Sequence, residues 1–380
     1  MLTHSQMKRL YYLSATSFSQ VDLGILPELS KKYDLTYALV TPQGNSYVGL
    51  GDIENYCRNN SIKLKFFPFR RRLRDLRTGS DFNKVLNDIK RTNPDIIYTI
   101  SHDVPILSLL CCRLPATKTI VAIHDVEFHS GSKFPFFLKI SRMITMTHFK
   151  NFQVFSRNQE NILRTKYPKK RIYNIPLSLG YYGNSTHTHQ NDNKKNNSIT
   201  FLFFGNILPY KGLHFLLKAV CNLSLKYTNF QLIVAGQCSE WETVYEPLIS
   251  NKAVVTKMIR FIDSTVIPDL FSGTHYLVLP YTEATQSGPL MMAYNFNLPV
   301  IASKIDSFKD AVIEGTTGYL YDRNDEAGLE NALEAAIIRS QTEYDDLCRR
   351  LKEHTLNNYS APLLSKKYEQ MFKTSLEGMA

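Results

Sequence analysis

Two short segments in the second half of the chain combine residue types that can hold a phosphorylated ligand. The first runs from Phe203 to Gly212 and reads FFGNILPYKG. A glycine directly after a strand lets the backbone approach a ligand, and a lysine before the next helix adds a charge suited to phosphate. Gly205, Asn206 and Lys211 are therefore candidates for this role, although turn glycines and a solvated lysine would produce the same pattern.

The second segment follows a buried run and reads PYTEATQSGPL, ending at Leu290. Ser287 or Gly288 can cap a helix whose first turn suits Pro289, so free N–H groups there would face a diphosphate. Glu283 would then lie close to the hydroxyls of a sugar. A carboxylate in an ordinary surface loop is the competing interpretation.

The elements that position these segments alternate between β-rich runs and helical patterns, which is typical of doubly wound parallel sheets. In the first half, strands are expected at 9–14, 35–41, 62–68, 95–100, 118–123 and 152–155. Helices are expected there at 22–33, 81–92, 104–112, 135–149 and 158–167. In the second half, strands are expected at 199–204, 230–235, 254–262, 276–280 and 300–303, and helices at 213–227, 289–296 and 326–339.

This alternation predicts an α/β chain of two Rossmann-like domains facing across a ligand-binding cleft, in agreement with its length of 380 residues. The expected domains are 1–183 on the acceptor side and 199–355 on the donor side. The polar stretch 184–198 would link them, and a C-terminal helix within 356–380 would cross back to the first domain.

The order of motifs in the second half resembles the C-terminal domain of the family-four retaining glycosyltransferases, which have the GT-B fold. The similarity covers about 199–340 and includes KG at 211–212, VAG at 234–236, EATQSG at 283–288, LPVIA at 298–302 and GTTGY at 315–319. The EATQSG variant is similar to that of bacterial enzymes that build cell-surface polysaccharides. The resemblance implies a nucleotide-sugar donor bound by this domain, with no cofactor and no metal.

The first half resembles the same family more weakly, through the strand that ends in Ile123-His124-Asp125. The resemblance implies that His124 contacts the donor sugar, so that His124, Glu283 and Lys211 form the catalytic set. A histidine that merely caps the strand end is the structural alternative. Asp125, Glu127 and His129 have metal-ligand chemistry, but similar GT-B enzymes need no metal.

Two departures from the family pattern concern the donor. The second glutamate of the usual pair falls near Met291 or Met292, and the arginine that accompanies the phosphate-binding lysine is replaced at the corresponding places by Asn206 and Leu208. Loss of the arginine removes a positive charge that would stabilise the departing phosphate, and this matters more for catalysis than loss of the glutamate contact to the ribose.

The positive charge is concentrated in the first half. Residues 1–183 hold 27 Lys and Arg against 13 Asp and Glu, whereas residues 184–380 hold 18 against 21. This asymmetry predicts an anionic partner, and a membrane surface or a phosphate-bearing acceptor is favoured over nucleic acid because no nucleic-acid-binding motif is present. The proposed membrane or acceptor surface consists of Arg70, Arg71, Arg72, Arg74, Lys133, Lys139 and Arg142.

The longest apolar runs reach about eight residues, too few for a membrane span, and the six cysteines lack the spacing of a zinc site. We therefore expect a cytoplasmic protein, peripheral at the inner face of the cell membrane. The expected function is transfer of a sugar to a glycan or lipid-linked acceptor in surface polysaccharide biosynthesis. The alternatives are a catalytically weak or inactive GT-B subunit that binds a glycan, nucleotide or partner, and a nucleotide-sugar epimerase.

Overall fold

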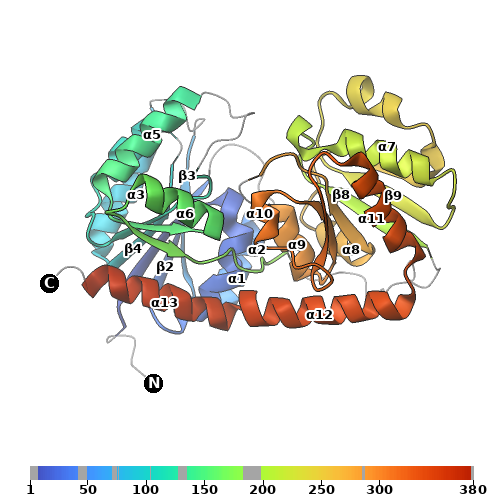
Figure 1. Ribbon diagram of the computed structural model, residues 1–380. Helices are drawn as coiled ribbons and strands as arrows, with labels where there is room; N and C mark the ends of the chain where they lie inside the picture. Colours follow the sequence, from blue (N-terminus) through green and yellow to red (C-terminus); the bar gives the residue numbers. More distant parts are fainter. Residues whose placement is uncertain are drawn as a thin grey trace. The chain divides into compact units, whose positions relative to one another are not determined.

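The computed structural model describes residues 7–41, 49–70, 75, 77–102, 104–126, 135–182, 198–284 and 287–377 (Figure 1). The chain divides into two compact units, one formed by Met1–Tyr181 with Tyr359–Ala380 and the other by Tyr182–Asn358. Each unit contains a parallel sheet covered by helices, so the predicted α/β class is confirmed.

The first unit contains a seven-stranded sheet in the order β3-β2-β1-β4-β5-β6-β7, and every pair is parallel. This is the Rossmann order with one added strand. The chain adds strands toward one edge of the sheet up to β3 and toward the other edge from β4 onward, so the order reverses between β1 and β4. Its strands are β1 Arg9–Ala15, β2 Asp34–Thr41, β3 Lys63–Pro68, β4 Ile96–Ile100, β5 Thr119–Ala122, β6 Asn151–Val154 and β7 Arg171–Asn174. Its helices are α1 Ser19–Ser30, α2 Leu50–Asn59, α3 Thr78–Thr92, α4 Pro105–Cys111, α5 Pro135–His148, α6 Arg157–Lys166 and α13 Ala361–Glu377.

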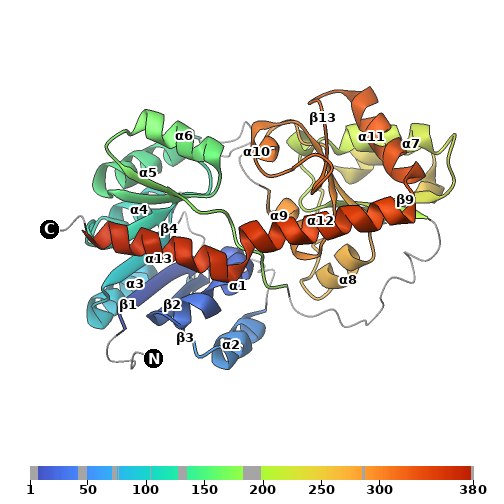
Figure 2. The same cartoon turned by 60° about the horizontal axis from the view of Figure 1, so that its bottom comes forward.

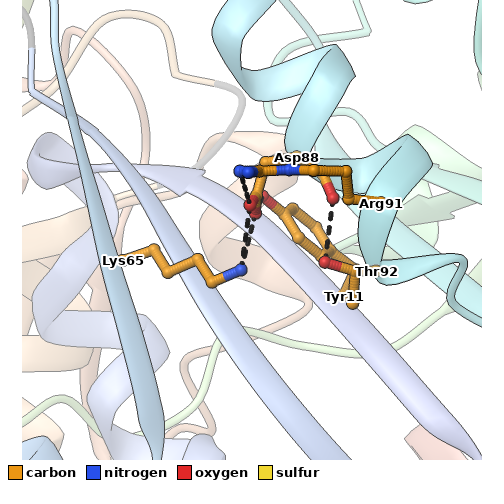
Figure 3. Close-up of polar contacts among 5 residues, drawn as sticks. All are labelled: Tyr11, Lys65, Asp88, Arg91 and Thr92. Carbon is orange, nitrogen blue, oxygen red and sulfur yellow. Dashed lines mark hydrogen bonds and ion pairs between the residues drawn. The ribbon is translucent and has the colours of Figure 1, made fainter.

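Helix α3 is fastened to this sheet by a buried carboxylate (Figure 3). Asp88 accepts hydrogen bonds from the Tyr11 hydroxyl at 2.9 Å, from Lys65 Nζ at 2.8 Å and from an Arg91 Nη at 3.0 Å. Burial opposes ionisation of Asp88, but these donors hold the pKa of its carboxyl below the ordinary value. The network links α3 to β1 and β3 and thereby fixes the rotation of the helix.

The C-terminal helix α13 packs on the first sheet beside α1 (Figure 2). Phe372 contacts the rings of Tyr33 and Tyr98, and the Tyr368 hydroxyl accepts a hydrogen bond from Gln153 at 3.1 Å. The last helix of the chain therefore completes the core of the first unit.

The second unit has a six-stranded parallel sheet in the order β10-β9-β8-β11-β12-β13, which repeats the Rossmann order. Its strands are β8 Ile199–Phe204, β9 Phe230–Ala235, β10 Val255–Met258, β11 Tyr276–Leu279, β12 Val300–Ser303 and β13 Gly318–Tyr321. Its α-helices are α7 Leu213–Leu223, α8 Ile267–Ser272, α9 Gly288–Asn295, α10 Asp306–Lys309, α11 Glu326–Ile338 and α12 Gln341–Tyr359, whose last residue is assigned to the first unit.

The predicted central strands agree with the structure because central parallel strands are buried on both faces and are apolar throughout. The strand expected at 254–262 is shorter, since β10 ends at Met258. Strand β8, with the sequence ITFLFF, is buried along nearly its whole length. The sequence prediction omitted several elements, including α2, β7, α8 and β13. The two omitted strands are four residues long, and each lies at one end of its sheet, where the apolar run is short.

Candidate functional site

The two phosphate-binding candidates of the second unit follow adjacent strands at the reversal point of its sheet. Gly205 directly follows β8, and Pro280 directly follows β11, which pairs with β8. In open α/β sheets the ligand binds outside the carboxyl ends of the strands at such a point. The structure therefore brings the two segments to the position where a ligand is expected.

Three of the predicted residues converge at this edge. Gly205 has φ +102°, and a Cβ atom built on it would lie 3.0 Å from Lys211 Nζ and 3.7 Å from Pro289 Cγ. A side chain at this position would therefore crowd the ammonium group and strain the backbone. The absence of a side chain at Gly205 keeps the space beside the Lys211 ammonium group open.

The loops after β8 and β11 are joined by backbone contacts. A Cβ atom on Gly212, which has φ +66°, would lie 2.0 Å from the carbonyl oxygen of Pro280. The N–H of Thr282 donates to the carbonyl of Tyr210 at 2.7 Å. Glu283 follows Thr282 directly and is partly exposed, so it belongs to the same joined pair of loops as Lys211.

The start of α9 supplies the helix terminus that the sequence predicted. Ser287 is its N-cap, with Oγ accepting from the N–H of Leu290 at 3.2 Å, and Pro289 occupies the first turn. Gly288 is exposed, and an added Cβ there would meet nothing within 4 Å. The positive end of the helix dipole is thus accessible beside Lys211, as anion binding requires.

Lys211 is the most distinctive charge of this site because the residue is only 8% exposed. No described carboxylate forms an ion pair with it, and its Nζ lies 5.5 Å from the centre of the Tyr281 ring. Burial lowers the pKa of Lys211 from 10.5 to about 8. A buried ammonium group without a carboxylate partner is suited to bind an anion that arrives from solution.

The positions where the family pattern is incomplete have ordinary structural roles. Met291 and Met292 belong to α9 itself, and each is buried, with an exposed fraction of 7%. Asn206 and Leu208 are exposed in the loop between β8 and Lys211. Among the residues described, Lys211 and the α9 amides therefore provide the positive potential at this edge.

His124 lies in the first unit, two residues after β5, with its ring between two aromatic rings. The centre of the imidazole is 4.1 Å from that of Phe18 and 4.5 Å from that of Phe155, with interplanar angles of 20° and 22°. Its carbonyl accepts a hydrogen bond from the buried amide of Gln159. Burial lowers the pKa of His124 to about 4, opposed by the charge of Asp125, so the imidazole is neutral at pH 7.

The proposed membrane or acceptor surface is described only in part. The Arg70 side chain is exposed, and Lys139 is exposed on α5. Arg142 differs from them, because it is only 9% exposed and its guanidinium donates to the carbonyl of Asp125 at 2.7 Å, so it does not contribute to an exposed surface. Arg71, Arg72, Arg74 and Lys133 lie outside the described residues.

Helices α4 and α5 carry an apolar patch of four exposed side chains. Its members are Leu109, Phe136, Phe137 and Met143, with exposed fractions of 56%, 68%, 54% and 61%. Lys139 lies between them on α5. Exposed aromatic and aliphatic side chains near a lysine have the chemistry of an interfacial surface.

Within the described part of the chain, no three His, Cys, Asp or Glu side chains are placed to hold a metal ion. Glu127 and His129 lie outside that part. No helix among the described residues is both long and apolar enough to cross a bilayer.

Sequence reasoning did not identify the aromatic partners of the two key side chains. Tyr281 stands in the predicted loop but had no assigned role, and its ring faces Lys211. Phe18 and Phe155 are distant from His124 in sequence, so no spacing pattern could connect them. Their identification required the tertiary structure.

Comparison with known proteins gives a family match for the second unit. Residues 198–338 match the model of a family described as Glycosyl transferases group 1. A GDP-mannose:glycolipid 4-beta-D-mannosyltransferase of Xanthomonas campestris pv. campestris is 26% identical over 132 residues, which are 34% of this chain and 37% of that protein. A capsular polysaccharide biosynthesis glycosyltransferase of Staphylococcus aureus is 20% identical over 186 residues, 48% of each chain. The matches thus span less than half of either relative.

The fold has counterparts among solved structures. Sucrose-phosphate synthase from Thermosynechococcus elongatus superposes with a TM-score of 0.72 at 14% identity, over 97% of this chain and all of that one. This likeness and the two Rossmann-type sheets confirm the predicted GT-B fold class.

Proposed function

We propose that this chain, whose residues 198–338 match the model of the group 1 glycosyltransferases, transfers a sugar from a nucleotide-sugar donor to a membrane-associated glycan or lipid-linked acceptor. The observation that carries the proposal is the buried Lys211 ammonium group beside the open start of α9. The names of the matched relatives, which refer to GDP-mannose, a glycolipid and capsular polysaccharide, support a role in surface polysaccharide biosynthesis.

In the proposed reaction the bond between the anomeric carbon and the diphosphate breaks, and the acceptor oxygen bonds to that carbon on the same face. The acceptor proton passes to the departing diphosphate, so no protein nucleophile is needed. Lys211 and the N–H groups of α9 stabilise the negative charge of the leaving group. Glu283 orients the sugar hydroxyls, and neutral His124 serves as a hydrogen-bond partner of the donor sugar.

The proposed acceptor side is the first unit, at the anionic inner face of the membrane. The apolar patch of α4 and α5 would enter the interface while Lys139 contacts headgroups. Replacing Phe136 and Phe137 together by serine should weaken co-sedimentation with anionic vesicles. Serine at Leu225 and Ile338, which are 87% and 67% exposed in the second unit, is the control. Equal loss in both variants would contradict this orientation.

The central experiment follows release of nucleoside diphosphate from a panel of nucleotide sugars, with and without membrane extract. We expect one donor to be consumed, faster with extract, and Lys211→Ala to lower the rate by about a hundredfold or more. Glu283→Ala should also lower it. Lys304→Ala changes an exposed lysine of the same unit, 3.8 Å from Asp322, and should leave the rate unchanged.

The configuration of the product tests the stereochemistry separately. A product with the anomeric configuration of the donor supports the retaining mechanism, and an inverted product refutes it while leaving glycosyl transfer intact. This measurement is informative because one matched relative is named for a beta linkage. Conversion of the donor without any acceptor would favour an epimerase, and a folded protein inactive with every donor would favour a binding subunit.

A further inference from the structure

A cavity of about 230 Å³ lies in the first unit, away from the edge that carries His124. It is formed by the last turn of α3, the turn leading into β4 and the residues between α4 and β5. These segments lie at the amino-terminal ends of the strands, whereas Rossmann-type sheets bind their ligands at the carboxyl ends. The cavity is therefore distinct from the candidate site described above.

The cavity is lined by cations and amides. Lys90, Arg113 and Lys118 contribute three positive charges, and Asn87 and Asn93 contribute side-chain amides, while none of the lining residues is acidic. Lysine and arginine donate charge-assisted hydrogen bonds, for which phosphate oxygens are strong acceptors. The lining therefore matches a phosphate group.

Two contacts hold this arrangement in place. Arg113 donates to the side-chain oxygen of Asn83 at 2.6 Å, which ties the end of α4 to α3. Asn83, Asn87 and Lys90 follow the spacing i, i+4, i+7 and share one face of α3. The Asp88 network (Figure 3) ties a different face of α3 to the sheet, and Asn87 and Lys90 are exposed.

Nearby negative charge does not neutralise the cavity. Asp95 interacts electrostatically with Lys118, but it already accepts the Arg9 N–H at 2.8 Å and lies 3.5 Å from the Arg9 guanidinium. Helices α3 and α4 both end here, and each C-terminus carries a partial charge of about −0.5. Three full positive charges exceed two half negative ones, so the cavity stays electropositive.

Size and surroundings restrict the ligand further. A volume of about 230 Å³ is below the roughly 300–1,000 Å³ of a pocket for a drug-sized molecule, which favours a small phosphate ester. Leu109, 56% exposed, precedes Arg113 by one helical turn, and Met143, 61% exposed, lies on the adjacent α5. Figure 2 shows α4 between α3 and α5, so the apolar patch and the cavity belong to neighbouring elements.

We propose that the cavity lined by Lys90, Arg113 and Lys118 binds a phosphate ester, carried either by a lipid headgroup or by a small dissolved molecule. Binding requires neither the sugar donor nor the candidate site at α9. The inference is therefore independent of the proposed glycosyl transfer.

The test measures binding of glycerol 3-phosphate to the full chain by calorimetry, and binding of phosphatidylcholine vesicles with and without phosphatidic acid by flotation. The cavity variant combines Lys90→Gln, Arg113→Gln and Lys118→Gln. The matched control combines Lys169→Gln, Lys366→Gln and Lys367→Gln, which removes three charges from exposed lysines of the same unit. Both variants are checked for folding by the temperature of thermal unfolding.

We expect the cavity variant to weaken phosphate binding by about tenfold or more, and the control by less than about twofold. Cavity-dependent binding of glycerol 3-phosphate identifies a dissolved ligand. Cavity-dependent binding of phosphatidic acid vesicles without binding of glycerol 3-phosphate identifies a lipid headgroup. The proposal is overturned if the wild type binds neither glycerol 3-phosphate nor phosphatidic acid vesicles, or if the two folded variants lose binding equally.

Discussion

Replacing Lys211 by methionine should make the free protein more stable while abolishing its response to nucleoside diphosphates. Methionine has similar length and no charge, so it fills the same space without a buried ammonium group. In the free protein Lys211 is 8% exposed, and its Nζ lies 5.5 Å from the centre of the Tyr281 ring. Stability and ligand binding should therefore change in opposite directions.

The magnitude follows from the pKa of Lys211, which burial lowers from 10.5 to about 8. A difference of 2.5 pKa units corresponds to about 3 kcal/mol. Contact with an aromatic ring offsets about 0.5–2 kcal/mol of this cost. We therefore expect the free energy of unfolding to be about 1–3 kcal/mol higher for Lys211→Met at pH 7.

The pH dependence has a defined sign. Because the folded pKa is depressed, the unfolded chain holds more protons between about pH 8 and 10.5, and wild-type stability gains from Lys211 across this window as pH rises. The variant lacks this contribution. The advantage of Lys211→Met should thus decrease above pH 8 and disappear near pH 10.5.

The assay can use Trp241, which is the single tryptophan of the chain and lies in the second unit with Lys211. It is 3% exposed, and its indole N–H donates to Glu246 at 2.8 Å, so its fluorescence reports unfolding of that unit. Denaturant titrations give the stability of each variant. A nucleoside diphosphate at about one hundred times its Kd should stabilise the wild type by about 2.7 kcal/mol and leave Lys211→Met unchanged.

A variant less stable than the wild type at pH 7 would refute this reasoning, since it would show that the lysine has a net stabilising partner. Lys304→Met controls for loss of a lysine charge in the same unit. Its side chain is 52% exposed, and we expect little change in stability or ligand response. An unaltered diphosphate response in Lys211→Met would exclude this lysine from the binding site.

Three further predictions test the structure. Burial raises the pKa of Asp22 from 3.8 to about 6, so the folded state holds more protons than the unfolded chain between these pH values. The free energy of unfolding of the wild type should therefore fall by up to about 3 kcal/mol as the pH rises from 3.8 to 6. Denaturant titrations of Asp22→Asn should lack this decrease. Gly212→Ala places a Cβ 2.0 Å from a carbonyl oxygen at φ +66° and should lower the free energy of unfolding by about 2 kcal/mol or more, with loss of diphosphate binding. The control Gly288→Ala has open space around the new Cβ and should fold normally. Equal stabilities of the two variants would contradict the close approach of the two loops. Asp88→Ala leaves the buried Tyr11 hydroxyl without its acceptor and should lower the free energy of unfolding by about 2–4 kcal/mol, which thermal unfolding would detect. Arg91→Ala removes a side chain that is 80% exposed and should lower the free energy of unfolding by less than about 1 kcal/mol.

Local sequence determined the elements and the loops that carry the candidate donor site. Central strands such as Ile199–Phe204 are recognisable because burial on both faces demands continuous apolar residues. Ser287 followed by Gly288 and Pro289 specifies a helix start through capping and backbone preferences that act over a few residues. These features depend on near neighbours, so the sequence alone was sufficient to predict them.

Tertiary structure decided which side chains are buried and what they contact. Arg142 belongs to a basic, acid-free segment, yet its helix is rotated so that its guanidinium reaches the carbonyl of Asp125. Burial lowers the pKa of His124, whose ring stacks on Phe18 and Phe155, and burial also lowers the pKa of Lys211 near Tyr281. Desolvation depends on atoms brought together from distant parts of the chain, and a linear pattern contains no measure of that distance.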